Sequence, residues 1–285
     1  MTVGQALKHA AEELAANQIP DAGVEAEWML AHLLSVPRNI LFLKSGLPLD
    51  PPFEAALELF LERRSRREPL QHILGSVSFC GIELAVNEHA LVPRPETEEL
   101  ADHAWNHLNA STIAQPKVLD FGTGTGCLAI AIAMNCERAQ IHAIDKSRRA
   151  LELARQNVRE LNLSARITFG HGEGFEALDE SRRFDLIVSN PPYIPAREIT
   201  TLQPEVRDYD PRLALDGGAD GLEFYRMFAE QAGYWLISGG VLMAEFGDGQ
   251  ETFLPDVFAK PEWTGLRVMN DLGGIPRFFE VRRSL

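Results

Sequence analysis

The sequence contains few cysteines, and their spacing excludes two classes of small stabilised fold. Three cysteines occur among 285 residues, at positions 80, 127 and 136. An odd number cannot pair completely, no C-x-x-C spacing is present, and no histidine lies at metal-ligand spacing from them. These absences argue against a disulfide scaffold and a zinc ribbon, and they fit a reducing compartment. We therefore expect no bound metal.

Long apolar runs and targeting segments are also missing. The longest unbroken apolar run, Cys127 to Met134, has 8 residues, whereas a membrane-spanning helix needs about 20. The first residues, Met-Thr-Val-Gly-Gln, lack the basic stretch and apolar core of a secretory signal, and they are not rich in arginine as a transit peptide is. We expect a cytoplasmic protein that has no membrane partner.

Positive charge is scarce. The chain has 27 basic and 41 acidic residues, for a formal net charge of −14. Binding to nucleic acid requires clustered lysine and arginine, so this balance argues against a general nucleic-acid binder. One basic cluster, Arg63 to Arg67, is present. We interpret it as the solvated last turn of a helix, in preference to an RNA-binding patch, because cations suit a helix C-terminus.

Apolar residues make up 45% of the chain and charged residues 24%, which is typical of a globular protein of about two domains. Up to about residue 70, apolar side chains recur at helical spacing. Residues 77–86 alternate in the manner of a β-hairpin with a tight turn at Cys80-Gly81. The expected organisation is a helical domain over 1–72, a hairpin linker over 73–92 and a catalytic domain over 93–285.

Strand and helix patterns alternate from residue 117 onward, which predicts an α/β fold with a mostly parallel sheet covered on both faces. Ligands of such sheets bind beyond the carboxyl ends of the strands. The loops of interest are those that follow the strands predicted to end at Phe121, Asp145, Phe169 and Ser189. The expected strands are 117–121, 140–145, 167–169, 184–189, 241–246, 266–269 and 277–281, and the expected helices are 126–135, 147–161 and 222–236.

The first of these loops is glycine-rich. Gly122, Gly124 and Gly126 alternate with two threonines, so the backbone can turn sharply, and we expect its N–H groups to face a ligand at the start of a helix. Asp145 follows Gly126 by 19 positions, where a carboxylate can accept both ribose hydroxyls. The combination predicts an adenosine-bearing ligand. The third glycine is one residue early for a dinucleotide fingerprint, so the loop alone leaves S-adenosylmethionine and a dinucleotide as alternatives.

A second motif, Asn190-Pro191-Pro192-Tyr193, follows the strand expected beside the glycine loop. Two prolines stiffen the turn and remove two donors, which leaves carbonyl acceptors and the Asn190 amide. Such a site suits a planar NH₂ group, because the Asn190 side-chain oxygen and the Pro191 carbonyl can each accept one of its hydrogens. Tyr193 adds a flat apolar face with a polar tip.

The two motifs together resemble the class-I S-adenosylmethionine-dependent methyltransferases that modify amide or exocyclic nitrogens. Four further segments narrow the resemblance to the HemK/PrmC family, and the match covers nearly the whole chain. These segments are 68–75, 92–98, 205–215 and 271–277.

This resemblance implies a Rossmann-like sheet with an antiparallel last strand, joined by a β-hairpin to a small N-terminal helical domain. It also implies transfer of a methyl group from S-adenosylmethionine, with S-adenosylhomocysteine as the product. The acceptor in this family is the side-chain nitrogen (N5) of the GGQ-motif glutamine in bacterial class-I peptide chain release factors. The expected partner is therefore a release factor, with no direct contact to nucleic acid.

Residue roles follow from the same resemblance. The family pattern leaves Phe175 either as a substitute for an adenine-stacking aromatic missing at Gly174 or as a core residue. It also leaves Glu96, Glu205 and Arg207 either in a substrate groove or as structural ties. The implied cofactor-binding residues are Gly122, Thr123, Gly124, Thr125, Gly126, Asp145, Glu173, Gly174 and Asn190, and the implied catalytic residues are Asn190, Pro191, Pro192 and Tyr193.

Three other functions stay open. A nucleic-acid amino-methyltransferase grips an NH₂ group with the same four-residue motif, although the net charge opposes it. A sister enzyme that methylates a glutamine of a ribosomal protein shares both motifs, although the Arg94-Pro95-Glu96-Thr97 segment favours the release-factor branch. A cofactor-binding adaptor without activity is the third, and the intact Asn-Pro-Pro-Tyr segment argues against it.

Overall fold

The computed structural model describes all residues, 1–285, and they fall into two compact units. We call Met1–Ser76 with Gln203–Tyr209 the helical unit, and Val77–Leu202 with Asp210–Leu285 the sheet unit. The sequence did not predict that residues 203–209 would pack with the first 76. No helix in either unit is both long enough and apolar enough to cross a membrane.

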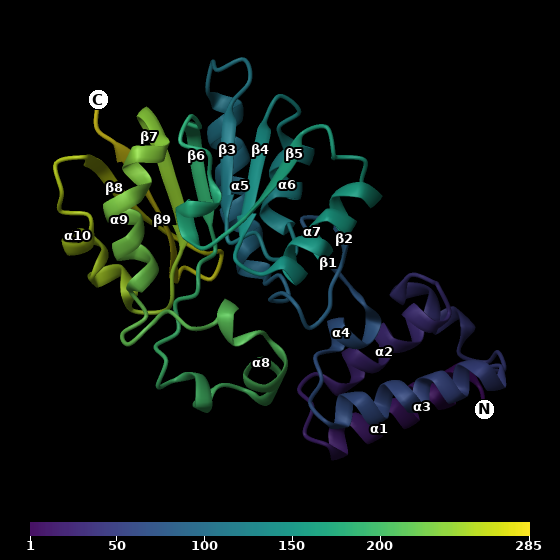
Figure 1. Ribbon diagram of the computed structural model, residues 1–285. Helices are drawn as coiled ribbons and strands as arrows, with labels where there is room; N and C mark the ends of the chain where they lie inside the picture. Colours follow the sequence, from purple (N-terminus) through teal and green to yellow (C-terminus); the bar gives the residue numbers. More distant parts are fainter. The chain divides into compact units, whose positions relative to one another are not determined.

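The helical unit is built from short amphipathic helices whose starts are encoded locally. Thr2 and Gln5 form a reciprocal capping box at the first helix, and Pro51 occupies the first turn of another. Leu14, Leu30 and Leu57 from three different helices are fully buried in one shared core. The elements are α1 (Val3–Ala16), α2 (Ala22–Leu33), η1 (Arg38–Lys44), α3 (Pro51–Ser65), α4 (Leu70–Leu74) and α8 (Pro204–Tyr209) (Figure 1).

Arg64 on α3 corrects the interpretation of the basic cluster as solvated. It is only 4% exposed. Its Nε lies 2.6 Å from Glu25 Oε2 on α2, and its Nη1 lies 3.0 Å from Glu205 Oε1 on α8. Glu205 also pairs with Arg67 at 2.8 Å. Glu205 therefore ties α8 to the helical unit, whereas Arg207 is paired with its neighbour Asp208.

A two-stranded hairpin joins the units along the chain. Its strands are β1 (Ser76–Phe79) and β2 (Ile82–Ala85). Between them, Cys80 and Gly81 both have positive φ values, of 50° and 73°. Two consecutive residues in that region form the mirror-image turn that suits the twist of a hairpin. The hairpin expected from the alternating pattern is therefore present, with its turn at the expected dipeptide.

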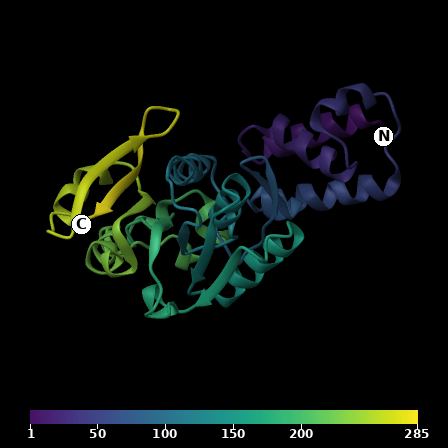
Figure 2. The same cartoon turned by 90° about the horizontal axis from the view of Figure 1, so that it is seen from above.

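The sheet unit contains one seven-stranded sheet in the order β5-β4-β3-β6-β7-β9-β8 (Figure 1). β3, β4, β5, β6 and β7 pair in parallel, and β9 pairs antiparallel to β7. The β8–β9 hairpin forms one edge, seen in yellow in Figure 2. This confirms the predicted α/β class with an antiparallel last strand. The strands are β3 (Lys117–Phe121), β4 (Gln140–Asp145), β5 (Ile167–His171), β6 (Phe184–Ser189), β7 (Leu236–Glu245), β8 (Trp263–Asn270) and β9 (Pro276–Arg283).

Helices cover both faces of this sheet, because successive strand residues point to opposite sides. On β6, Leu186 and Val188 face one apolar core, while Ile187 between them faces the other. The first core also contains residues of α5 (Pro95–Ala110), α6 (Cys127–Asn135) and α7 (Arg148–Glu160). The second contains residues of α9 (Glu223–Trp235) and α10 (Leu254–Val257).

The strand order reverses between β3 and β6. From β3 the chain proceeds outward to β4 and β5, and from β6 it proceeds outward to β7 on the other side. Beyond the carboxyl ends of strands at such a point the connecting loops diverge and leave a crevice. Two short segments contribute residues to its wall, η2 (Gly174–Ala177) and η4 (Arg212–Ala214). The other short segments of the sheet unit are η3 (Ile199–Thr201) and η5 (Gln250–Thr252).

Candidate active site

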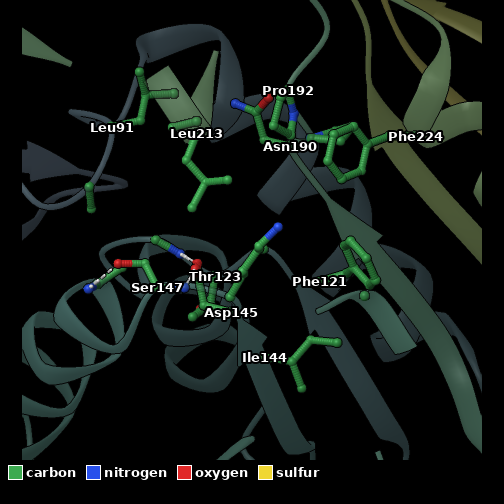
Figure 3. Close-up of a pocket in the computed structure, with 18 of the residues that line it drawn as sticks. Leu91, Phe121, Thr123, Ile144, Asp145, Ser147, Asn190, Pro192, Leu213 and Phe224 are labelled. Carbon is green, nitrogen blue, oxygen red and sulfur yellow. Dashed lines mark hydrogen bonds between the residues drawn. The ribbon is translucent and has the colours of Figure 1, made fainter. Parts of the chain in front are cut away.

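A pocket of about 420 Å³ lies at the carboxyl ends of the central strands, within the sheet unit. That volume is in the range of small-molecule and cofactor sites. In Figure 3, Thr123, Asp145 and Ser147 lie on one side of it, and Asn190 and Pro192 lie on the other. Of the residues predicted from the sequence, the pocket wall includes Gly122, Thr123, Gly124, Thr125, Asp145, Glu173, Gly174, Asn190, Pro191 and Pro192.

The glycine loop turns sharply, but most of its N–H groups do not face the pocket. The Gly122 and Thr123 N–H groups both donate to the Ile144 carbonyl, at 2.9 Å each. The Gly124 N–H donates to Asp145 Oδ2 at 2.9 Å, and the Gly126 N–H donates to the Thr123 carbonyl. The expectation of ligand-facing donors is therefore wrong for these four. These hydrogen bonds fix the loop, and of its five N–H groups they leave only that of Thr125 for a pyrophosphate.

Gly126 does not line the pocket, although it was predicted to. It precedes α6 with φ +85°, a conformation that favours glycine. A Cβ atom added there would lie 3.3 Å from the Cβ of Ala154 on α7. Gly126 therefore lets the loop and α7 approach closely, and it acts on the pocket only through that packing.

Asp120, the fourth residue of β3, lies buried beneath the loop. Its Oδ2 accepts hydrogen bonds from Thr123 Oγ1 at 2.6 Å and from the Ala129 N–H, in the first turn of α6, at 3.1 Å. Its Oδ1 has no partner within the chain. Burial raises the pKa of this carboxyl to about 7. Because this carboxyl group already takes the Ala129 N–H at the start of α6, that donor is not available to an anion bound there.

Asp145 is held at the end of β4 by backbone donors. Oδ1 accepts from the Ser147 N–H at 2.7 Å, and Oδ2 accepts from the Gly124 N–H at 2.9 Å (Figure 3). Burial raises the pKa of the carboxyl, although these two hydrogen bonds oppose that shift. Each carboxylate oxygen has a further lone pair. The side chain can therefore accept two more hydrogen bonds from a ligand in the pocket.

The charged groups of the pocket wall are mostly acidic. Asp145, Glu173, Glu176 and Glu223 line it, against one lysine, Lys146. That lysine pairs with Glu173 at 2.6 Å, at an exposed position. A pocket with this excess of carboxylates attracts a cationic ligand and repels a polyanionic one. The glycine loop alone left S-adenosylmethionine and a dinucleotide as alternatives, and this charge distribution favours the first.

Phe175 belongs to the core. It is 4% exposed, it packs against Phe121 and Phe228, and its ring stacks on Trp235 at 6.0 Å with an interplanar angle of 10°. It borders the pocket from this fixed position. Gly174 beside it has φ +57°. Apolar residues of α9 complete this part of the wall, among them Phe224 and Met227.

The Asn-Pro-Pro-Tyr segment follows β6 directly, as predicted, and β6 does lie beside β3. Asn190, Pro191 and Pro192 line the pocket, whereas Tyr193 does not. The Tyr193 hydroxyl instead donates to Glu245 Oε1 at 3.3 Å. Burial raises the pKa of this phenol, so it stays protonated.

Tight backbone packing holds this segment in place. A Cβ atom added to Gly217 would lie 2.8 Å from backbone atoms of Tyr193, and one added to Gly221 would lie 2.4 Å from the Tyr193 carbonyl. That carbonyl accepts from Gln250 Nε2 at 2.9 Å. The Pro191 carbonyl, in contrast, accepts no hydrogen bond within the chain. An unused acceptor therefore projects from a rigid turn that borders the pocket.

Three residues of the site were given no role from the sequence. Thr97 lines the pocket, and its hydroxyl contacts Asn190 and the buried Glu245, although these residues are 93 and 148 positions away from it. His89 and Leu213 also line the wall. Thr97 and Leu213 lie within the family-like segments 92–98 and 205–215, which is the signal that could have pointed to them, whereas His89 lies outside both.

Cys127 also lines the pocket, in the first turn of α6. A helix N-terminus usually favours a thiolate. Here burial and the charge of Asp120 raise the pKa of the thiol to about 12. The side chain is therefore a neutral apolar wall group and not a nucleophile.

Two family models match the chain. The PrmC N-terminal domain matches residues 5–75, and the methyltransferase small domain matches residues 102–205. A methyltransferase from Pyrococcus furiosus has a similar structure, with a TM-score of 0.53 at 16% identity; the match covers 79% of this chain and 99% of that one. At that identity the likeness concerns the fold alone.

Two curated relatives extend over most of the chain. The release factor glutamine methyltransferase of Geobacter sulfurreducens is 40% identical over 264 residues, which cover 93% of this chain and 90% of that protein. The protein of the same name from Deinococcus radiodurans is 37% identical and covers 100% of this chain and 99% of its own length. By these matches, together with the pocket that joins the glycine loop to Asn-Pro-Pro-Tyr, the chain belongs to the family of release factor glutamine methyltransferases.

Proposed function

We propose that the protein transfers a methyl group from S-adenosylmethionine to the side-chain nitrogen (N5) of the GGQ-motif glutamine in bacterial class-I peptide chain release factors. One observation carries the proposal beyond family membership. Asn190 and Pro191, whose carbonyl accepts no hydrogen bond within the chain, border the same pocket as the acidic residues expected on its cofactor side. A planar NH₂ group can therefore be held where a cofactor can reach it.

The pocket fits this cofactor on two grounds. Its wall is acidic, which suits a ligand with a sulfonium and an ammonium group. Four of its five loop N–H donors are used within the chain, which disfavours a pyrophosphate. The residues that would hold S-adenosylmethionine are those of the glycine loop at Gly122–Thr125, with Asp145 at the ribose and Glu173–Gly174 beside the adenine.

S-adenosylmethionine would supply a methyl group that its positively charged sulfur already activates. The chain must therefore orient a weak nucleophile, because the lone pair of an amide nitrogen is delocalised. Asn190 Oδ1 and the Pro191 carbonyl would each accept one hydrogen of the glutamine NH₂ group. As the new N–C bond forms and the S–C bond breaks, those hydrogens become more positive, so both hydrogen bonds strengthen toward the transition state.

No side chain of the segment is suited to act as a general base. The pKa of Tyr193 is raised by burial, and its hydroxyl is directed to Glu245. The methylated nitrogen carries a positive charge until one of its protons leaves, and water can accept that proton. The contribution of the protein is therefore orientation and electrostatic complementarity, not proton transfer by a dedicated residue.

Specificity for the release factor needs contacts beyond the glutamine. We propose that the helical unit binds the body of the release factor, while the amide reaches the pocket of the sheet unit. The site of action would then be the cytoplasm, where translation ends. The net charge of −14 supports a protein substrate over a nucleic acid.

The test is a methyl-transfer assay with labelled S-adenosylmethionine. Purified release factor, its GGQ→GGA variant, ribosomal protein and duplex DNA are compared side by side. Label on the wild-type release factor alone, lost in the Gln→Ala variant, is the expected result. Label on ribosomal protein or DNA would assign the enzyme to another substrate, and no label on any of them would overturn the proposal.

A further inference from the structure

A chain of hydrogen bonds leads away from the pocket behind Asn190. Asn190 Nδ2 donates to Thr97 Oγ1 at 2.9 Å, and Thr97 Oγ1 donates to Glu245 Oε2 at 2.7 Å. The other oxygen of Glu245 accepts from the Tyr193 hydroxyl at 3.3 Å. Neither Thr97 nor Glu245 belongs to the motif that grips the amide, yet one buried carboxylate is linked to both ends of that motif, directly to Tyr193 and through Thr97 to Asn190.

The backbone explains why the carboxylate reaches this place. Ser189 at the end of β6 is in register with Ala244 on the parallel strand β7. Asn190 follows Ser189 and Glu245 follows Ala244, so the two residues lie at the same level at the ends of neighbouring strands. Glu245 is 2% exposed, and the Tyr225 hydroxyl fixes its backbone carbonyl at 3.1 Å. The carboxylate is thus anchored by the sheet.

We propose that Glu245 and Thr97 are positioning residues that determine which way the side-chain amide of Asn190 points. A carboxylate only accepts hydrogen bonds, so the Thr97 hydroxyl must give its hydrogen to Glu245. The remaining lone pairs of Thr97 Oγ1 can then only accept, and they take the NH₂ end of the Asn190 amide. Its oxygen is left for the substrate. This inference rests on the proposed function, because it assigns the Asn190 side-chain oxygen to the glutamine amide of the substrate.

The direction of these hydrogen bonds matters because the side-chain amide of Asn190 has two unlike ends, an oxygen that accepts and an NH₂ group that donates. If Asn190 were turned over, its NH₂ group would face the NH₂ group of the glutamine, and two donors would repel. Nothing within Asn190 itself prevents this reversal, since the oxygen and nitrogen of the amide have nearly the same size. The carboxylate, acting through one hydroxyl, makes the two orientations unequal.

The protonation state of Glu245 makes the orientation of the Asn190 amide depend on pH. Burial raises the pKa of its carboxyl to about 7; Glu96 also raises it, whereas the hydrogen bonds from Thr97 and Tyr193 and the charge of Arg277 lower it. Once protonated, Glu245 can donate, the Thr97 hydroxyl can turn around, and Asn190 loses its preferred orientation. Turnover should therefore rise with pH through the pKa of this one group.

The experiment measures methyl transfer to the release factor at saturating cofactor, over a range of pH, for matched variants. Glu245→Gln keeps the size of the side chain but removes the pure acceptor, and we expect kcat to fall about tenfold or more, with the pH-dependent limb lost. Thr97→Val should lower kcat in the same way, and Thr97→Ser, which keeps the hydroxyl, should restore it. Affinity for S-adenosylhomocysteine, measured by calorimetry, should stay within about twofold of wild type.

Two substitutions serve as controls in the same sheet. Glu280 on β9 is paired with Arg267, and Thr168 on β5 is bonded to His142, and neither lines the pocket. Glu280→Gln and Thr168→Val should keep both kcat and the pH limb. If the wild type methylates the release factor while Glu245→Gln and Thr97→Val keep its kcat and its pH limb, the positioning role is wrong. If the wild type does not methylate it, the proposed function itself fails. If Glu245→Gln does not fold, the comparison of Thr97→Val with Thr97→Ser tests the positioning role instead.

Discussion

Arg64 and Glu205 are 141 positions apart in the chain, yet Nη1 of one lies 3.0 Å from Oε1 of the other. Arg64 also contacts Glu25, so a nearly buried guanidinium is shared by two carboxylates from α2 and α8. Both hydrogen bonds and both charges raise the pKa of Arg64, although its burial opposes them. The arginine therefore remains charged, and its removal would leave the Glu25 carboxylate without its partner and Glu205 with Arg67 alone.

Arg64→Ala should destabilise the helical unit by about 3 kcal/mol, because breaking a buried ion pair leaves uncompensated charge. Chemical denaturation followed by circular dichroism would measure this. Arg66→Ala is the matched control: Arg66 is exposed and pairs only with Glu62. Its loss should change stability by less than about 0.5 kcal/mol. Equal effects of the two substitutions would contradict the structural role of Arg64.

Asn190→Ala should remove turnover while leaving the fold intact. Loss of one preorganised hydrogen-bond partner costs about 2–4 kcal/mol in the transition state, or about 10²–10³-fold in kcat. The labelled methyl-transfer assay would measure it, with the melting temperature as the check on folding. A variant that keeps near-normal turnover would remove Asn190 from the site.

Asp145→Ala should act on the cofactor and not on the amide. The substitution removes the acceptor for the Gly124 and Ser147 N–H groups, as well as the proposed contact with the ribose. We expect affinity for S-adenosylhomocysteine to fall about tenfold or more, since a charged hydrogen-bond partner is lost. Titration calorimetry tests this. Glu152→Ala, at an exposed position on α7, is the control, and an affinity of Asp145→Ala equal to that of this control would contradict the assignment.

Stability should fall as pH rises from about 4 toward about 7 and should level off above. Burial raises the pKa of Glu245 from 4.5 to about 7 and that of Asp120 from 3.8 to about 7. A raised pKa in the folded state means that folding favours the protonated form. Each group thus contributes stability that is complete below its unfolded pKa of about 4 and that is lost as pH approaches about 7.

Thermal unfolding of wild type and of Glu245→Gln between about pH 5 and pH 8 would measure this contribution. The wild type should lose melting temperature across this range more steeply than the variant, because the variant cannot ionise at position 245. Glu280→Gln should follow the wild-type slope. Parallel curves for wild type and Glu245→Gln would show that Glu245 does not titrate in this range.

Thiol reagents should react slowly with Cys127 although it lines the pocket. Burial raises the pKa of its thiol to about 12, so very little thiolate is present near neutral pH. The rate of alkylation, followed by mass spectrometry with and without denaturant, would measure this. Rapid alkylation at position 127 in the folded protein at about pH 7.5 would contradict the assigned pKa shift.

Local patterns predicted most of the fold. Alternating strand and helix signals gave the parallel sheet, because the period of apolar residues reflects how each element packs. The placement of Asn190 beside the glycine loop followed from the rule that ligands bind at the carboxyl ends of parallel strands. Cys80-Gly81 marked the hairpin turn, since glycine permits the positive φ that such turns require.

Interactions between distant segments could not be predicted in the same way. The cation of Arg64 was expected in solvent, because nothing near it in sequence revealed that Glu205 would cover it. The donors of the glycine loop were expected to face a ligand, because the Ile144 carbonyl that takes two of them comes from another strand. Thr97 lies in a family-like segment but was given no role, since its partner Glu245 is 148 positions away.

The helical unit is assembled from two separate stretches of chain, residues 1–76 and 203–209. Exchange of the first stretch between relatives would transplant Arg64 together with Glu25 but without Glu205, its second carboxylate partner. A functional chimera should therefore need α8 from the same parent. A substitution at Arg64 or Glu205 alone should lower the stability of the helical unit. The helical unit is thus inherited as two non-adjacent pieces of coding sequence, which limits how freely recombination can exchange it between relatives.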